Sequence, residues 1–309
     1  MSSMEPVYSP GDWLPTVALA VLIFLGVVCA FVGIGPLKGG PHRVLDVTKD
    51  FEEYRLMEKE ELSHDTRKFT FALPEGYVLG LPTGQHMTLK FTNKDGQAVQ
   101  RSYTPVTDNT SIGKVSFVIK VYKAGVHPKF PEGGQMSQHL ESLSIGDKML
   151  MKGPKGHMEY FGKGNFKVKP LGKKLQERSC NAIGMMAGGT GITPMLQILH
   201  FIFRNPNDKT RVKMIYANQT EDDILVRDEL EALQKEFPDR FSLHYTVDKA
   251  PEGWKFSEGF INRDMIEKHL IIPGSKQQFF MCGPPPMIKF ACIPGLAELG
   301  FSDQDHVTF

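Results

Sequence analysis

Apolar and polar residues alternate along three short segments in the first half of the chain. Residues 66–73 carry Phe, Phe and Leu at every second position, and residues 85–91 and 114–122 repeat that spacing. A period of two is typical of strands that bury one face. Turn signals separate the segments, and residues 137–143 have the pattern of one short helix. We therefore predict an antiparallel barrel or sandwich of short strands over residues 51–155.

A different pattern follows a lysine-rich connector at residues 156–180. Continuous apolar runs, which are typical of buried strands, alternate with segments of helical periodicity from residue 181 to residue 309. The expected strands are 181–187, 211–218, 241–248 and 277–283, and the expected helices are 194–205, 223–237 and 263–270. This order predicts a doubly wound parallel α/β sheet, in which ligands bind outside the carboxyl ends of the strands.

The N-terminal region is more apolar than either half. Residues 13–37 contain no charged side chain, and at about 1.5 Å per residue they approach the roughly 30 Å thickness of a bilayer. We predict a membrane-spanning anchor, with a cleaved signal peptide and a buried core helix as alternatives. Lys and Arg follow this segment at residues 38–50 and are absent from residues 1–12. The positive-inside rule then leaves residues 1–12 as a short non-cytosolic terminus and places the remainder in the cytosol, after a linker at 38–50.

Charge and cysteine content narrow the range of partners. The chain has 36 basic and 35 acidic residues, a net charge of +1, so no global field favours nucleic acid. Its cysteines, Cys29, Cys180, Cys282 and Cys292, show neither a C-x-x-C pair nor zinc spacing. We therefore expect no metal site and no disulfide framework, which fits a reducing compartment.

A glycine-rich loop follows the first strand of the second half. The sequence Ala-Gly-Gly-Thr-Gly-Ile-Thr-Pro-Met spans residues 187–195, and Thr193 with Pro194 reads as an N-cap and first helical residue. The spacing is neither G-x-G-x-x-G nor a P-loop. It fits a ligand lying close to the backbone, or tight packing of helix on strand without a ligand. The later Cys-Gly-Pro-Pro-Pro-Met turn, residues 282–287, favours the ligand because three prolines fix its shape.

A second candidate nucleotide site lies in the first half. Alternation along Arg-Ser-Tyr-Thr, residues 101–104, puts Arg101 and Tyr103 on one face. A guanidinium can hold a pyrophosphate, a phenol can cover a ring, and Thr104 can bond a heterocycle edge. Gly133 and Gly134 precede a predicted helix whose free N–H groups would favour an anion. The alternative is an exposed strand with an ordinary arginine and tyrosine.

Eight ordered motifs resemble one known family. They are RSYTPVT, VIKVY, HPKFPEGGQMSQ, GDKMLMKGPKG, MMAGGTGITPMLQ, IYANQTEDDILVRDEL, YTVDKAPEGW and MCGPPPM. Together they resemble the membrane-bound NADH-cytochrome b5 reductases, which are ferredoxin reductase-like flavoproteins, over residues 51–309. Reductase modules of nitrate reductase share most of these motifs, and the apolar segment at 13–37 favours the membrane-bound enzymes. The resemblance implies a β-barrel FAD domain at 51–155 and an NADH domain at 181–309.

The resemblance also implies which residues hold the two cofactors. Arg101 would bind the FAD pyrophosphate, and Tyr103 and Thr104 the isoalloxazine. The other residues implied at the flavin are Ser102, Val118, Lys120, Gly134, Gln135, Met136, Ser137 and Thr193. Those implied at NADH are Gly189, Thr190, Gly191, Asp248, Cys282, Gly283, Pro284 and Met287. Thr104 and Cys282 are the implied catalytic residues. Ser102 and Lys123 depart from the family pattern, and Phe309 is a further candidate at the flavin.

The implied reaction is hydride transfer from NADH to FAD, followed by one-electron transfer to cytochrome b5. That acceptor is acidic around its haem, and a lysine run could guide its docking or could be a solvated connector. The run consists of Lys163, Lys167, Lys169, Lys173 and Lys174. The same motifs would also serve a reductase with another acceptor, and a non-enzymatic membrane-tethered nucleotide-binding protein is a further alternative. The expected location is the endoplasmic reticulum or the mitochondrial outer membrane, facing the cytosol.

Asp248 bears on cofactor choice, because it follows the predicted strand 241–247 at the carboxyl edge of the sheet. A carboxylate there can accept from a ribose 2′-hydroxyl and repels a 2′-phosphate. We therefore expect NADH to be preferred to NADPH. The alternative is that Asp248 caps the Lys-Ala-Pro turn that follows it.

Overall fold

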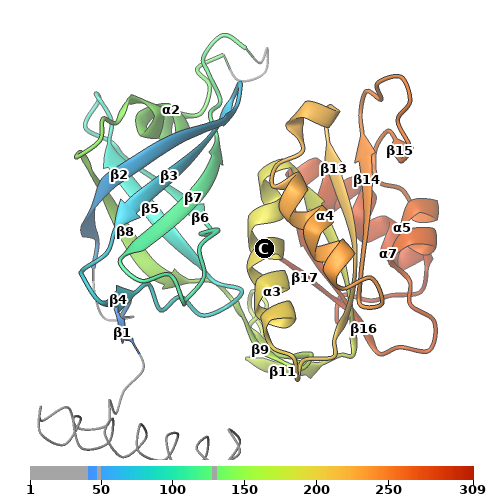
Figure 1. Cartoon of the computed structure of the whole chain (residues 1–309). Helices are drawn as coiled ribbons and strands as arrows, with labels where there is room; N and C mark the ends of the chain where they lie inside the picture. The colour runs from blue at the N-terminus through green and yellow to red at the C-terminus, as the bar shows by residue number, and fades with distance from the viewer. Residues whose placement is uncertain (1–40, 47–49, 127–130) are drawn as a thin grey trace, which may run out of the picture. The chain divides into compact units, whose positions relative to one another are not determined.

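The computed structural model describes residues 41–46, 50–126 and 131–309 (Figure 1). The predicted terminus at 1–12 and anchor at 13–37 lie outside the described residues. Within the described ranges, no helix combines the length and the apolar character needed to cross a membrane. Arg43–Phe309 forms one compact unit. It contains an antiparallel sheet followed in the chain by a parallel one, which we call the FAD-binding half and the NADH-binding half after the expectations above.

The FAD-binding half is built on six antiparallel strands in the order β6-β5-β8-β2-β3-β7. Their bounds are β2 Glu52–Ser63, β3 Thr66–Ala72, β5 His86–Thr92, β6 Ala98–Tyr103, β7 Lys114–Lys120 and β8 Lys148–Lys155. The three segments predicted from alternation are β3, β5 and β7, and their apolar faces form one core with Leu56 and Met151. The short strand β1, His42–Arg43, precedes this set, and the short strand β4, Tyr77–Val78, lies between β3 and β5 in the chain. The sequence prediction of an antiparallel sheet of short strands is confirmed.

The predicted short helix of this half is α2, Gln135–Ser142. Gly134 is its N-cap, and Gly133 adopts a φ of +66° that glycine tolerates best. Leu140 of α2 joins the core of the sheet. The helix therefore begins beside the sheet with its N-terminal N–H groups near the end of β7.

The segment predicted as a connector, residues 156–180, is a folded antiparallel sheet. Its strands are β9, Met158–Gly162, β10, Asn165–Val168, and β11, Gln176–Ser179, in the order β11-β10-β9. Phe166 and Val168 alternate into the core of the NADH-binding half. Lys167 between them and Lys169 after them point away from this core, and the many lysines of the segment hid the alternation in the sequence.

The NADH-binding half contains six parallel strands in the order β15-β14-β13-β12-β16-β17. Their bounds are β12 Ala182–Gly188, β13 Arg211–Asn218, β14 Phe241–Val247, β15 Ser257–Glu258, β16 Gln277–Cys282 and β17 His306–Thr308. All four predicted strands are present. In the sheet, β12 lies between β13, which follows it in the chain, and β16, so the strand order reverses at β12. Such a reversal creates a crevice at the carboxyl ends of the two strands.

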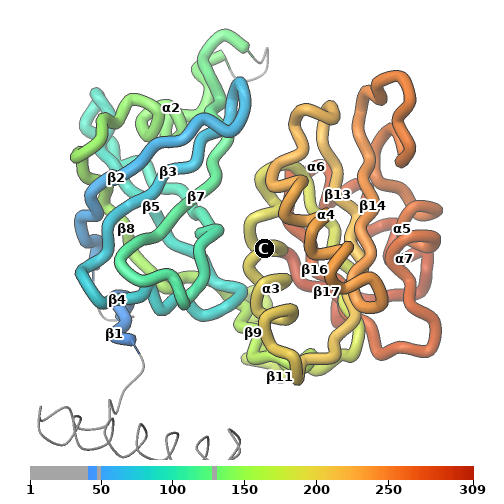
Figure 2. The backbone as a smooth tube through the Cα atoms, in the orientation of Figure 1, coloured from blue at the N-terminus to red at the C-terminus, as the bar shows by residue number. Residues whose placement is uncertain are grey.

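Helices cover both faces of this sheet, as Figure 2 shows. The helices and turns are η1 Gly189–Gly191, α3 Ile192–Arg204, η2 Glu221–Asp223, α4 Arg227–Glu236, α5 Arg263–Leu270, α6 Pro285–Met287, η3 Ile288–Cys292 and α7 Ile293–Glu298. Leu196 of α3 and Leu230 of α4 pack into one core, whereas Ile266 of α5 and Leu296 of α7 pack into another. The doubly wound arrangement of this half is therefore present.

Two predicted helix starts were wrong. Helix α3 begins at Ile192 with Gly191 as its N-cap, because η1 runs directly into it, and the Thr193 hydroxyl donates to the Thr190 carbonyl at 3.2 Å. Helix α4 begins at Arg227, after Val226 in the left-handed region at φ 50°, and not at residue 223. Residues 221–223 form η2 instead, closed by a capping box between Thr220 and Asp223.

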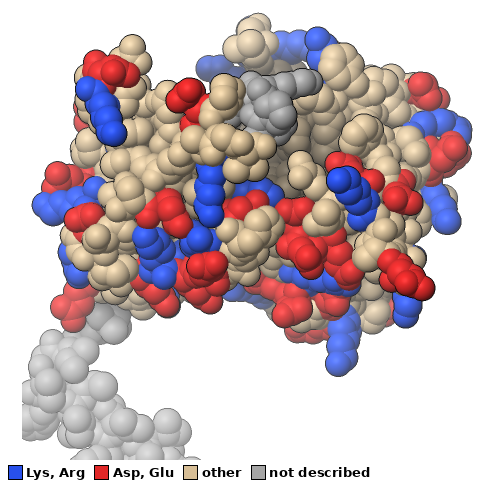
Figure 3. All heavy atoms as spheres, turned by 90° about the horizontal axis from the view of Figure 1, so that it is seen from above, with Lys and Arg blue, Asp and Glu red and all other residues tan. Residues whose placement is uncertain are grey.

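Charges of both signs are mixed on the surface, as the face in Figure 3 shows. This matches the net charge of +1 and the absence of a single-sign field expected from composition.

A histidine pair gives the NADH-binding half an acid-sensitive contact. The rings of His244 on β14 and His269 on α5 stack with centroids 3.5 Å apart, and His244 Nε2 lies 2.8 Å from Ser257 Oγ. Burial, followed by the neighbouring His269 and Lys268, lowers the pKa of His244 to about 4. The unfolded chain would bind a proton near pH 6.5 and the folded chain would not, so stability falls as pH drops from about 6.5 toward 4.

We expect the free energy of unfolding to fall between pH 7.5 and pH 5 by on the order of 1 kcal/mol through His244, allowing for its partial exposure. Gln at position 244 does not titrate and keeps a polar partner for Ser257. In His244→Gln the pH dependence measured by urea unfolding should therefore be flatter than in the wild type. The exposed His157→Gln serves as the control and should keep the wild-type slope. An unchanged slope in His244→Gln would contradict the assignment.

Candidate functional site

Two loops meet at the crevice where the strand order reverses. The glycine-rich loop leaves β12 as η1, and the Cys-Gly-Pro-Pro-Pro-Met turn leaves β16, the neighbouring strand. Both loops therefore emerge at the same carboxyl edge. This juxtaposition was predicted from the order of the elements, and the structure brings the two motifs into direct contact.

Glycine is required at this contact because the backbones approach closely. A Cβ at Gly188 would lie 2.7 Å from Met287 Sδ, a Cβ at Gly191 would run into the Cys282 carbonyl, and a Cβ at Gly283 would lie 2.6 Å from Met287 Cε. Gly189 is different: its φ is +52°, and a Cβ there would meet nothing within 4 Å. Loop packing therefore explains three glycines, whereas Gly189 lies in a left-handed turn that is open to a ligand.

The open turn at Gly189 is held in place by a buried tyrosine of the sheet. Tyr216 on β13 donates its hydroxyl to the Gly189 carbonyl at 3.0 Å and accepts the Leu225 N–H at 3.3 Å. Burial raises the pKa of Tyr216, so its proton stays in place for this bond. Sequence patterning had assigned Tyr216 only to a buried strand, because nothing in its spacing indicates a contact with a loop 27 residues away.

Cys282 is the last residue of β16, and its thiol is protonated. Burial raises the pKa of Cys282 to about 11, so the side chain is neutral near pH 7. It packs against the core that includes Phe280, and Phe309 contacts the same core. The Phe309 N–H also donates to the Met281 carbonyl at 2.9 Å. The C-terminal residue and Cys282 therefore belong to the same edge of the sheet.

Two polar residues stand at the ends of β13 and β14. Asn218 is 8% exposed, and within the described part of the chain neither its amide nitrogen nor its amide oxygen has a hydrogen-bond partner of good geometry. The amide nevertheless lies close enough to the Tyr216 hydroxyl to offset part of the rise that burial causes in the pKa of Tyr216. The backbone carbonyl of Asn218 accepts the N–H of Asp248 at 3.1 Å. Burial, together with Asp223, raises the pKa of Asp248. A buried amide beside a carboxylate, at the ligand edge of a parallel sheet, is suited to bind a polar ligand.

The candidate flavin residues of the FAD-binding half cluster around the end of β6. Arg101 is exposed, and its guanidinium donates to the adjacent Gln100 carbonyl at 2.7 Å. Tyr103 packs on the core, and burial raises its pKa to about 12, with Arg101 and Tyr122 close enough to influence it. Ser102 lies between them on the strand, and Thr104 follows its end. This cluster presents a cation and a phenol ring together at the end of one strand.

The start of α2 lies against β6. Ser137 Oγ accepts the Tyr122 N–H at 3.1 Å and donates to the Gly134 carbonyl at 3.0 Å. Gln135 is the first residue of the helix, and Met136 is 2% exposed in the core of the sheet. The Met136 side chain therefore faces inward, and a contact with a ligand would involve its backbone.

β7 connects the two halves. Val118 packs into the core of the NADH-binding half, while Phe117 and Ile119 point into the core of the FAD-binding half. The Lys120 ammonium pairs with Asp65 and Asp223, each at 2.8 Å. The sequence did not indicate these two ion pairs, since Asp223 is 103 positions from Lys120.

The lysine run lies on and between β9, β10 and β11. Lys167 pairs with Glu177 at 3.2 Å and lies over the Phe161 ring. Leu171, at the tip between β10 and β11, is fully exposed. The run is therefore carried by a defined sheet, and its role in docking stays a prediction.

Comparison with known proteins agrees with this arrangement. A model of the oxidoreductase FAD-binding domain matches residues 53–160, and one of the oxidoreductase NAD-binding domain matches residues 185–293. The chain is 46% identical to NADH-cytochrome b5 reductase 1 of Bos taurus over 298 residues, covering 96% of this chain and 97% of that protein. It is 50% identical to NADH-cytochrome b5 reductase 3 of Rattus norvegicus over 257 residues, covering 82% and 85%.

A solved structure has the same fold. The crystal structure of the cytochrome b5 reductase domain of Ulva prolifera nitrate reductase superposes with a TM-score of 0.80 at 46% identity, covering 86% of this chain and all of that one.

Proposed function

The chain belongs to the NADH-cytochrome b5 reductases, which are ferredoxin reductase-like flavoproteins, and from this membership we propose that it transfers electrons from NADH through FAD to cytochrome b5. The observation that carries the proposal is the pair of loops at the sheet reversal, η1 and the turn after Cys282, in a chain that also matches the FAD-binding domain. Both halves of a reductase are thus present.

The described residues fit both cofactors. Asn218 offers a buried amide at the end of β13, and Gly189 is an open turn directly after β12, the strand that pairs with β13. Arg101 is an exposed cation close to the start of α2, where backbone N–H groups favour an anion such as a pyrophosphate. Tyr103 would cover one ring face. FAD, when bound, accepts a hydride from NADH and releases electrons singly to a haem.

The protein's own contribution is binding and alignment. Tyr216 fixes the open turn through the Gly189 carbonyl, so the backbone that would contact NADH is rigid. The neutral thiol of Cys282 adds a small uncharged group at the same edge. Hydride transfer moves the proton together with its electron pair, so the protein's part in that step is to align the two cofactors.

The proposal is tested by the absorbance of the purified full chain before and after anaerobic NADH. We expect a flavin spectrum that NADH bleaches within the mixing time or shortly after it. The spectrum should recover on addition of oxidised cytochrome b5, whose haem becomes reduced. A preparation without flavin, or a flavin that NADH does not bleach, would favour a non-enzymatic nucleotide-binding protein.

The same preparation tests the acceptor. If the lysine run between β9 and β11 guides docking of an acidic haem protein, turnover with cytochrome b5 should decrease steeply with ionic strength, whereas ferricyanide reduction should change less. Equal salt dependence with both acceptors would argue against docking by this run. Bleaching by NADH without reduction of cytochrome b5 would indicate a reductase with another acceptor.

We also propose that residues 13–37 anchor the chain in the endoplasmic reticulum or the outer mitochondrial membrane, with the catalytic halves facing the cytosol. The uncharged run and the Lys and Arg residues after it support this. Resistance of the membrane-bound chain to alkaline extraction tests it.

Closure of the antiparallel sheet into a barrel is a further proposal, supported by the bond from the Val106 N–H, just past β6, to the Ser116 carbonyl on β7 at 2.9 Å.

A further inference from the structure

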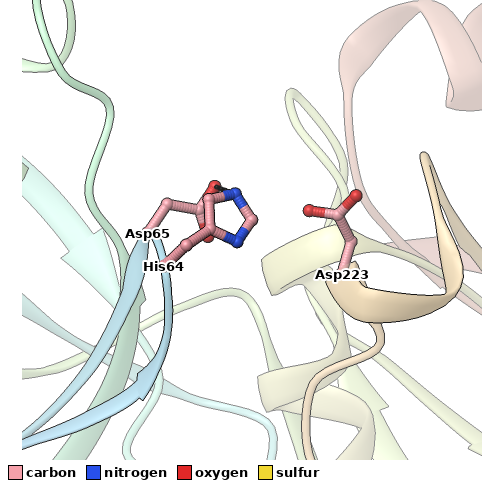
Figure 4. Close-up of side chains that lie close together, drawn as sticks. All are labelled: His64, Asp65 and Asp223. Atoms are coloured by element: carbon pink, nitrogen blue, oxygen red, sulfur yellow. Dashed lines mark ion pairs between the residues drawn. The ribbon is translucent and has the colours of Figure 1, made fainter.

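Lys120, at the end of β7, reaches from the FAD-binding half to the NADH-binding half. Its Nζ lies 2.8 Å from Asp65 Oδ2, in the turn between β2 and β3, and 2.8 Å from Asp223 Oδ1, at the end of η2. Figure 4 shows the Asp223 carboxylate directed toward Asp65 and His64, which come from the opposite half. One ammonium thus bridges two carboxylates that belong to different halves.

Each carboxylate is also fixed within its own half. Asp65 Oδ1 accepts the Thr66 hydroxyl at 3.1 Å, and Asp223 Oδ2 accepts the Thr220 N–H at 3.0 Å and its hydroxyl at 2.7 Å. The side chains of Lys120, Asp65 and Asp223 are 22%, 18% and 11% exposed. Anchored, largely buried charges are screened less by salt than an exposed ion pair.

The lysine determines whether the two halves attract or repel each other here. Carboxylate oxygens of Asp65 and Asp223 and a ring nitrogen of His64 lie within 4.8 Å of one another. Burial lowers the pKa of Lys120, but the bonds to Asp223 and Asp65 more than offset this and raise it, so the ammonium stays charged. If the lysine were not between them, two negative charges would face each other across the contact.

Another contact between the halves is uncharged. The side-chain oxygen of Gln197 on α3 accepts the Gly84 N–H at 2.6 Å, and its nitrogen donates to the Gln85 carbonyl at 3.3 Å. The Tyr160 N–H on β9 donates to the Thr83 carbonyl at 2.8 Å close by. This contact lies near the covalent connection between the halves and does not depend on ionic attraction. Arg204 of α3 also forms an ion pair with Asp108 of the FAD-binding half. The Lys120 contact differs from that pair because one ammonium holds two carboxylates, one from each half.

We propose that Lys120, Asp65 and Asp223 form an ionic latch that sets the separation of the two halves. The inference rests on the proposed function, in which Arg101 and Tyr103 hold one cofactor and η1, which lies against β7, holds the other. Hydride transfer requires reacting atoms about 3–3.5 Å apart, so a small change in this separation slows it strongly. Asp65 and Asp223 are positioning residues in this scheme.

The test uses Asp223→Asn in the full chain, because this removes the carboxylate that Lys120 reaches across the halves and keeps an acceptor for Thr220. We expect the rate of flavin reduction by NADH to fall roughly tenfold or more. We also expect faster hydrogen exchange in the peptides that carry η1 and η2, measured by mass spectrometry without NADH, and no change in the peptide that carries α5. Asp65→Asn removes the carboxylate that holds Lys120 within the FAD-binding half, and it tests the latch from that half.

Matched controls and a double mutant complete the test. Asp222→Asn removes the same charge from the same turn, where the carboxylate is exposed, and should leave rate and exchange unchanged. If both aspartates act through Lys120, the double variant should lose little more than either single one. Unchanged exchange in both single variants, or additive losses of rate, would overturn the latch. A wild type that NADH does not bleach would reject the proposed function, while the exchange measurement would still decide the latch.

Discussion

Replacing Arg101 with alanine should release most of the FAD. The guanidinium is exposed and, among the described residues, donates to the neighbouring Gln100 carbonyl, so the fold loses little. A pyrophosphate bound there would lose charge-assisted bonds of about 1.5–3 kcal/mol each. For two such bonds the expected increase in the Kd for FAD is on the order of a hundredfold or more. Flavin absorbance per protein after gel filtration measures it.

The control for this experiment is another exposed arginine of the same sheet. Arg55→Ala on β2 removes the same charge and should keep the wild-type flavin content. Circular dichroism of both variants establishes that the sheet is intact. Full occupancy of FAD in Arg101→Ala would show that the pyrophosphate binds elsewhere, and loss in both variants would point to a general effect of charge.

The parts of the fold that were predicted are those where local pattern and burial agree. β3 and β5 alternate because their apolar face packs on the core, and β12 is apolar throughout because both of its faces are covered. β7 alternates in sequence in the same way, although Val118 on its other face is buried too. β2 was not predicted. Most of its residues are charged and exposed, and only Tyr54 and Leu56 reach the core, so its strand character depends on pairing with β3 and β8.

At the candidate site, too, local sequence pattern could not supply contacts between distant segments. The sequence indicated that something lies close to the glycine loop, and the structure shows that at Gly188 and Gly191 this is the turn after Cys282, more than 90 residues later. Local sequence cannot separate packing from ligand binding, because both require the same missing side chain. At Gly189 no protein atom lies within 4 Å of the position that a Cβ would take, so the geometry there still supports the interpretation that a ligand approaches the loop.

Lys120 illustrates a contact that neither pattern nor resemblance could supply. The resemblance placed it at the flavin, whereas its ammonium is bridged between Asp65 and Asp223. An ion pair between halves depends on how two folded units meet, and this is not encoded in the spacing of any one segment. The assignment of Lys120 to the flavin stays a prediction.

Asp248 provides the prediction on cofactor choice. It directly follows β14, and its N–H donates to the carbonyl of Asn218 at the end of β13, so it lies at the ligand edge of the sheet. The turn interpretation is weakened because the Ala250 N–H donates to Glu258 Oε1 at 3.2 Å. The amide that Asp248 would cap therefore already has another partner.

We expect Asp248→Thr to shift preference toward NADPH. At about 5 Å and an effective dielectric constant of about 20, repulsion between Asp248 and a 2′-phosphate is on the order of 3 kcal/mol, or roughly a hundredfold in kcat/KM, before Lys249 offsets part of it. The ratio of kcat/KM for NADPH to that for NADH should therefore rise at least about tenfold. Steady-state ferricyanide reduction with each nucleotide measures the ratio.

The outcome distinguishes recognition from stability. If Asp248 only supported the turn, both nucleotides would suffer alike in Asp248→Thr, together with a lower unfolding temperature. Glu252→Gln removes an exposed carboxylate from the same loop and should leave the ratio unchanged, because its charge is not at the strand end. A wild type that uses NADPH as well as NADH would already refute the prediction, since the repulsion would then have no effect on the choice between them.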